Sequence, residues 1–263
     1  MLLAAAAVVL ILGAAAVAVI VADPHRLGTA YSGAPDGSRP DRSRPDGSRP
    51  DGSGAAAAAE QMITAPLAGR QRATFVLVDG LSSFDLRVAD LGDDLYRIST
   101  PAGSGVAARP EVRGETVRLG LVDTGASGTK AVRVLLNERA AWRLHLTGGV
   151  SGQVLDLSRA RLLGVELSGG SSRTEVLLPA VDGTMTVRLT GGTSQLDVRV
   201  PGQPPVRVRV GAGAGSVVVG DERWNGVAAG SLLGAPGWDR STDRLYLDLA
   251  AGANSVTVDT GPR

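Results

Sequence analysis

The stretch LSGGSSRTEVLLP, residues 167–179, places a Gly-Gly pair before Ser171 and Ser172, and such a loop could cradle an anionic ligand. A phosphate cradle needs a strand, a glycine loop and then a helix whose N-terminus faces the anion. No helical pattern follows this pair, and near copies of it recur along the chain. Repeated Gly-Gly pairs are typical of sharp corners, where the backbone often needs positive φ and no Cβ. We therefore expect Gly169 and Gly170 to form a structural corner that a valine at Gly170 would strain.

Acid–base chemistry on a sugar would need two carboxylates about 5 to 9.5 Å apart. Asp156, Glu175 and Asp197 lie on or near the outer side of successive expected strands, but such ladders are also typical of plain solvated faces. Neither His25 nor His145 has a serine and a carboxylate arranged recognisably around it. The sequence therefore indicates no catalytic residue and a protein that is not an enzyme, with a polysaccharide-acting enzyme as the less favoured alternative.

Metal, cofactor and nucleic-acid binding are not expected either. The chain has no cysteine, which excludes disulfides and thiolate zinc sites, and its two histidines lie in different parts of the chain. Lys plus Arg number 27 and Asp plus Glu 26, so the net charge is +1 and the chain lacks the overall basic character of nucleic-acid-binding proteins. We predict no metal-binding or cofactor-binding residue and no nucleic-acid partner.

The N-terminal segment, residues 1–22, has no charged or polar side chain. As a helix rising about 1.5 Å per residue it would extend about 33 Å, enough to cross a bilayer core. A cleaved signal peptide is the alternative, because Ala16 to Ala18 form a small-x-small site, although signal-peptide apolar regions are usually shorter. Arg26 alone would favour a cytoplasmic domain by the positive-inside rule. We nevertheless expect a single-pass anchor in the cell membrane and an extracytoplasmic domain.

Residues 23–69 are expected to form a disordered linker. From Asp36 the pentapeptide Asp-Gly-Ser-Arg-Pro recurs with small variations and offers no apolar residue to bury. Its aspartates and arginines balance each other, which favours a solvated spacer over a basic arm for phosphate or anionic lipid. At about 3.1 Å per residue the Pro-rich repeats would hold the following domain, residues 70–263, up to roughly 60 Å from the membrane.

The domain repeats one unit, which consists of a strand, a small residue, a glycine-rich corner and a second strand. The small residue recurs at steps of 21, 22, 21 and 39 positions: Thr147, Ser168, Thr190, Gly211 and Ala250. Alternate strand positions are aliphatic in every unit, and the twenty such positions would face one core. Units of this length bury their apolar faces by stacking at about 4.8 Å. The sequence therefore predicts an all-β, single-domain parallel β-solenoid of about 21 residues per rung.

Other features of the domain follow from this arrangement. Polar residues between the inward positions of the first strands would form an outward column with opposite charges on adjacent rungs: His145, Glu166, Arg188, Arg209 and Asp248. The stack is expected to start near Thr74. An insertion at roughly residues 221–242 carries Trp224 and Trp238, which could stack on a sugar or a partner, although we expect them to cap the end coils.

The unit V-x-L-S-G-G-x-S-x-x-x-V-x-L-P of residues 165–179, its near copy ending at Pro201 and the closing AGANSVTVD resemble the bacterial toast-rack family. That family is related to the C-terminal domain of LiaF-like cell-envelope stress proteins. The resemblance covers about residues 70–261 and implies a β-solenoid domain that is often tethered to a membrane. Its motif is a structural rung, so no functional residue carries over. The long linker and single membrane segment differ from multi-span LiaF-like proteins and argue against a direct signalling role.

Together these features predict a non-enzymatic, membrane-tethered domain of the cell envelope that binds a surface component or senses envelope stress. Its expected partners are the membrane, through the N-terminal helix, and an envelope protein or glycan. The alternative is a structural protein that forms homo-oligomers through the ends of its solenoid, since unpaired end strands are prone to associate.

Overall fold

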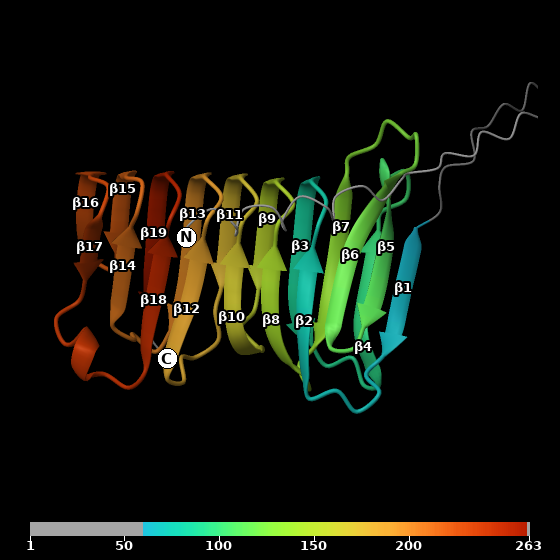
Figure 1. The fold of residues 1–263 in the computed structure, drawn as a ribbon, viewed down its shortest axis with the longest axis horizontal. Coiled ribbons are helices and arrows are strands. Elements are labelled where there is room, and N and C mark those ends of the chain that lie inside the picture. The colour runs from blue at the N-terminus through green and yellow to red at the C-terminus, as the bar shows by residue number, and fades with distance from the viewer. Residues whose placement is uncertain (1–59, 262–263) are drawn as a thin grey trace, which may run out of the picture. The chain divides into compact units, whose positions relative to one another are not determined.

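A computed structural model describes residues 60–261, and nearly all of the regular structure in them is β-strand. The strands form two sheets (Figure 1). The ten-strand sheet has the order β1 (Gln61–Pro66), β4 (Asp94–Thr100), β7 (Ala131–Asn137), β3 (Leu81–Ala89), β9 (Val150–Asp156), β11 (Ser171–Leu177), β13 (Thr193–Pro201), β19 (Ala253–Gly261), β15 (Ala214–Val219) and β16 (Glu222–Val227). The nine-strand sheet has the order β17 (Ser231–Gly234), β14 (Val206–Val210), β18 (Arg244–Leu249), β12 (Thr184–Leu189), β10 (Arg161–Leu167), β8 (Ala141–Leu146), β2 (Arg72–Leu77), β6 (Thr116–Asp123) and β5 (Val106–Arg113). A short 3-10 helix, η1 (Trp238–Arg240), lies between β17 and β18.

Each repeat unit contributes one strand to each sheet. β8 and β9, β10 and β11, β12 and β13, β14 and β15, and β18 and β19 are the five predicted strand pairs, and β2 and β3 form a sixth. Equivalent strands of neighbouring units pair in parallel and in register, so that Val165 lies opposite Val187 and Leu144. The predicted all-β class and the parallel pairing of the repeats are confirmed.

The order of the rungs differs from the order of the chain. The last unit, β18 and β19, lies between β12–β13 and β14–β15 rather than at the end. Antiparallel strands also close both ends of the sheets: β1, β4 and β5 at one end, β16 and β17 at the other. The prediction of a continuous parallel stack in chain order was therefore wrong at both ends. At one end the inserted strands β16 and β17 pair with the outer edges of β15 and β14, which leaves the final unit the position beside β12 and β13.

The core lies between the two sheets and is aliphatic, as the alternation of the sequence predicts. Nineteen of the twenty predicted inward positions are buried, and Val219 is half-buried against the same core. Aromatic side chains join the core near β2 and β3, where the ring centroids of Phe75 and Phe84 lie 6.3 Å apart. Trp142 is fully buried, and its Nε1 donates a hydrogen bond to the carbonyl oxygen of Asn137 at 2.8 Å.

The N-terminal part of the chain bears on two predictions. The expected membrane helix of residues 1–22 and most of the expected linker lie outside the described residues. Within the linker range, Gln61–Pro66 form β1, an edge strand paired with β4. In residues 60–261 there is no helix of sufficient length and apolar character to cross a bilayer.

Candidate functional site

The Gly-Gly loops are corners whose backbone amides are already used. The amides of Ser168 and Gly169 both donate to the carbonyl oxygen of Leu146 on the neighbouring rung, at 2.8 and 3.1 Å. The amides of Thr190 and Gly191 donate in the same way to Leu167, at 2.9 and 3.2 Å. An anion cradle would need these donors free. The corner reading of the opening motif is therefore supported by the hydrogen bonds.

The reason for glycine at these corners is close stacking, not positive φ. A Cβ on Gly169 would lie 2.8 Å from the amide nitrogen of Gly149 and closer still to the carbonyl group of Gly148. A Cβ on Gly170 would have ordinary contact, 3.6 Å from the carbonyl oxygen of Gly192. Neither Gly169 nor Gly170 has positive φ. The expectation of strain at Gly170 was therefore wrong, and the first glycine of the pair is the constrained one.

Ser171, the other candidate ligand group of that loop, makes structural hydrogen bonds. Its Oγ lies 2.8 Å from Oγ1 of Thr174 and donates to Oγ1 of Thr193 at 2.8 Å. Buried Gln153 extends this chain, because its Nε2 donates to Thr174 Oγ1 at 2.8 Å. This polar network was not predicted from the sequence. Gln153 and Thr174 occupy inward positions two residues before Leu155 and Val176, and only the aliphatic residues were expected to face the core.

The three candidate carboxylates all lie on the outer face of the ten-strand sheet. Glu175 lies opposite Asp197 on the next strand, whereas Asp156 lies opposite Leu177. Glu175 accepts from Arg199 at 3.0 Å, so its charge has a cationic neighbour. Within residues 60–261 no three His, Cys, Asp or Glu side chains come together as a metal site. The arrangement is that of a solvated, charge-balanced face.

The two tryptophans of the insertion belong to the cap. Trp224 lies opposite Val217 on β15 and packs against the core. The ring of Trp238 lies between two guanidinium groups, 3.9 Å from Arg207 and 4.2 Å from Arg244, and its Nε1 donates to a carbonyl oxygen of β18 at 3.1 Å. Neither ring is a free stacking platform.

An ion pair fastens the same cap. Asp239 accepts two hydrogen bonds of 2.9 Å from the guanidinium of Arg207. These bonds hold the pKa of the Asp239 carboxyl below its usual value and raise the pKa of Arg207. The pair stays charged at neutral pH and keeps η1 against the outer side of β14.

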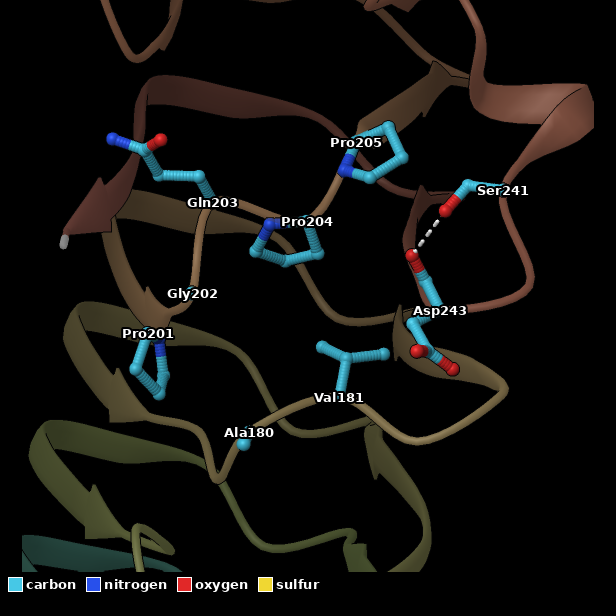
Figure 2. A pocket seen from close by; sticks show the side chains of 9 residues that line it. All are labelled: Ala180, Val181, Pro201, Gly202, Gln203, Pro204, Pro205, Ser241 and Asp243. Atoms are coloured by element: carbon cyan, nitrogen blue, oxygen red, sulfur yellow. Dashed lines mark hydrogen bonds between the residues drawn. The ribbon is translucent and has the colours of Figure 1, made fainter. Parts of the chain in front are cut away.

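A hollow of about 470 Å³ lies where residues 202–205 connect β13 to β14 past the ends of β18 and β19 (Figure 2). Pro204 and Pro205 form one wall, and Val181 lies on another. Asp243 is its one ionised side chain, and Asp243 Oδ1 already accepts the amide of Gly183 at 2.8 Å. The hollow therefore results from the position of β18 and β19 between the two preceding units, and its lining has few polar groups that could bind a ligand.

The outer face of the nine-strand sheet, which we name the basic face, has a distinct composition. Ten arginines point outward from it: Arg72, Arg109, Arg113, Arg118, Arg143, Arg161, Arg188, Arg207, Arg209 and Arg244. The same strands carry three outward carboxylates, Glu111, Glu166 and Asp248. Two more reach this face from outside the strands, Asp79 beside Gly120 and Asp239 on Arg207. Each of the eight adjacent strands from β14 to β5 carries at least one of the arginines. The charges of a nearly neutral chain are thus segregated onto one sheet face.

Four arginines of the basic face are ion-paired, Arg113 with Glu111, Arg188 and Arg209 with Asp248, and Arg207 with Asp239. The outer face of the ten-strand sheet is different, because its carboxylates match its arginines in number. Asp85 bonds to Arg87 at 2.9 Å, which raises the pKa of that arginine, and lies 3.8 Å from Arg133. Glu175 pairs with Arg199, and Asp197 lies 4.0 Å from Arg173. Outward arginines and carboxylates therefore balance on that side.

Comparisons with known proteins bear on the fold. The chain matches no known protein-family model, and no curated protein matches it. A crystal structure of a "putative cell adhesion protein" from Clostridium sporogenes is 14% identical, covers 78% of this chain and 99% of that one, and has a TM-score of 0.53. Structures named "putative adhesin" from Bacteroides fragilis and Parabacteroides distasonis are each 9% identical. They cover 77% and 76% of this chain and 95% and 97% of their own, and their TM-scores of 0.24 and 0.22 carry no argument. The first similarity shows a shared all-β fold.

Proposed function

We propose that this chain is a non-enzymatic binding module of the cell envelope, tethered to the membrane by residues 1–22 and using its basic face to hold a surface component. The observation that carries the proposal is the excess of arginine on one sheet face, where ten outward arginines accompany five carboxylates. Single-sign faces attract oppositely charged partners and speed their association. The resemblance of the repeat to the toast-rack family and the named adhesion protein of the same fold agree with such a role.

The fold offers less support for the alternative of self-assembly through the sheet ends. Edge strands avoid pairing when they are short or carry proline and charge. Here β17 has four residues, β1 ends in Pro66, and β5 carries Pro110 between Arg109 and Glu111. These features hinder the addition of another strand at three of the four edges.

We expect proteinase K added to intact cells to release a fragment of about residues 50–263. The pentapeptide repeats of the proposed linker have no apolar residues to bury and are open to cleavage, whereas the paired strands of the domain resist it. Immunoblotting of the supernatant with an antibody against the domain measures the release, and a cytoplasmic enzyme that stays intact is the control. If the domain resists protease until the cells are lysed, the extracytoplasmic placement is refuted.

A further inference from the structure

We propose that the occupant of the basic face is a linear acidic polysaccharide, a chain with repeated carboxylate groups, lying across β5, β6, β2, β8 and β10. This inference rests on the proposed surface-binding function and names the chemistry of the partner. Guanidinium groups bind carboxylates through two parallel hydrogen bonds, which suits arginine to this partner better than lysine.

Five arginines on these five adjacent strands form the core of the proposed site: Arg109, Arg118, Arg72, Arg143 and Arg161. All five side chains are exposed. Among the described residues, no carboxylate lies within 4.0 Å of any of them, in contrast to the paired arginines of the opposite sheet. In the register Arg72 and Arg161 lie level with Ala141, whereas Arg118 lies level with Val76 and His145, four positions further along. The five arginines therefore follow a diagonal across strands that are about 4.8 Å apart, and Glu111 on β5 lies opposite Arg118.

The residues between these arginines are small, which keeps the guanidinium groups accessible. Ala141 lies between Arg72 and Arg161 in the register, and Arg143 lies between Thr74 and Gly164. Gly164 has φ +151 and sits at an irregularity in the pairing of β10 with β8. Because it has no side chain, a hollow of about 190 Å³ opens beside Arg143, with His145, Glu166 and Arg188 also on its walls.

The hollow beside Arg143 could hold a side group of a polysaccharide that lies on the basic face. Glu166 and His145 interact across it, with Oε2 and Nδ1 3.3 Å apart. Glu166 can accept hydrogen bonds from sugar hydroxyl groups, while Arg143, which also lines the hollow, can bind a carboxylate. A polymer with both hydroxyl and carboxylate groups could therefore bind Glu166 through a hydroxyl and Arg143 through a carboxylate.

Two other polyanionic surfaces fit less well. Single-stranded nucleic acid binds where bases stack on aromatic rings, and the described outward side chains of these five strands include no Phe, Tyr or Trp. A protein that lies on a membrane surface buries an apolar face at the boundary between headgroups and acyl chains. Here the exposed large apolar side chains are only Val122 on β6 and Leu163 on β10, which lie on strands separated by β2 and β8. The chemistry of the face favours a hydroxyl-rich, carboxylated chain.

The test measures binding of the full chain, purified in a neutral detergent, to polygalacturonate and to neutral dextran of similar length. The face variant combines Arg72→Gln, Arg118→Gln and Arg143→Gln. The matched control removes three arginines from the opposite sheet: Arg87→Gln, Arg173→Gln and Arg199→Gln. Thermal unfolding confirms that both variants are folded, and each has lost the same net charge.

We expect polygalacturonate to bind and dextran not to bind. The face variant should bind more than tenfold more weakly and show a flatter dependence on salt, because fewer ion contacts remain to be screened. The control should stay within about twofold of the unmodified chain. Equal losses in both variants, or equal binding of dextran, would overturn the proposal.

Further measurements distinguish the polysaccharide from other anionic partners, and they test the proposed binding function separately from the identity of the polymer. Tighter binding to single-stranded DNA or to vesicles of anionic phospholipid than to polygalacturonate would contradict the polysaccharide assignment. If the chain is retained on isolated cell envelopes but does not bind polygalacturonate, the binding function is supported and the assignment of the partner as an acidic polysaccharide is refuted. If neither envelopes nor polymer retain it, the proposed function itself fails.

Discussion

Leu189→Asp should prevent the domain from folding. The side chain of Leu189 is 3% exposed and lies between Leu167 on β10 and Leu249 on β18, both of them buried. A carboxylate there would have no cation or hydrogen-bond donor, and burying it costs about 4 kcal/mol or more. That cost is comparable with the whole stability of a typical domain, about 5 to 15 kcal/mol.

Thermal unfolding followed by circular dichroism measures the effect. We expect no cooperative transition for Leu189→Asp, while Thr186→Asp, on the outer side of the same strand, should unfold within a few degrees of the unmodified chain. A cooperative transition at the original temperature in Leu189→Asp would show that the inward face of β12 has been assigned wrongly.

Gly169→Ala should destabilise the domain far more than Gly170→Ala. The added Cβ at Gly169 would overlap the backbone of the rung below, which has no side chain that could move aside. Overpacking against rigid groups costs about 3 kcal/mol, which lowers the melting temperature of a domain of this size by roughly 6 to 12 °C. The Cβ at Gly170 meets one oxygen at 3.6 Å and should change the melting temperature little.

The two glycine variants control for each other, because they make the same chemical change at adjacent positions. Gly191→Ala, at the equivalent position of the next rung, should repeat the loss seen for Gly169→Ala. Equal melting temperatures for Gly169→Ala and Gly170→Ala would contradict the close stacking of the corners.

The strand pairs and their inward faces could be predicted because they depend on local pattern. Alternate residues of a strand face opposite sides, so Val165 and Leu167 must share a face wherever the strand lies. The corner at Gly169 and Gly170 was predicted correctly for the same reason. Which of the two glycines has no room for a Cβ was not predicted. Whether Gly169 or Gly170 approaches the next rung depends on how the corners stack, and both glycines look alike in sequence.

The order of the rungs depends on contacts between units, although the sequence carries one signal of it. In chain order Arg188 would lie beside Arg209, which places like charges on adjacent strands. The insertion of β18 instead puts Asp248 between them, 3.6 Å from Arg188 and 2.8 Å from Arg209. The expected alternation of charge therefore holds only in the observed order.

The basic face was hidden by averaging over the chain. A net charge of +1 led to the expectation that the chain lacks the basic surface that nucleic-acid binding needs, but the two outer faces have different compositions. Had the outward positions of the first strands of each unit been counted separately, Arg143, Arg161, Arg188 and Arg209 would have stood out. The corresponding second strands offer Asp156, Glu175 and Asp197 along with their arginines, which balances that side.

Retention of the full chain on isolated cell envelopes of its source organism tests the proposed function most directly. The unmodified chain and the variant of the opposite sheet should be retained at low salt and released as salt rises, whereas the variant lacking Arg72, Arg118 and Arg143 should remain in solution. Equal retention of all three proteins at every salt concentration would contradict binding through the basic face.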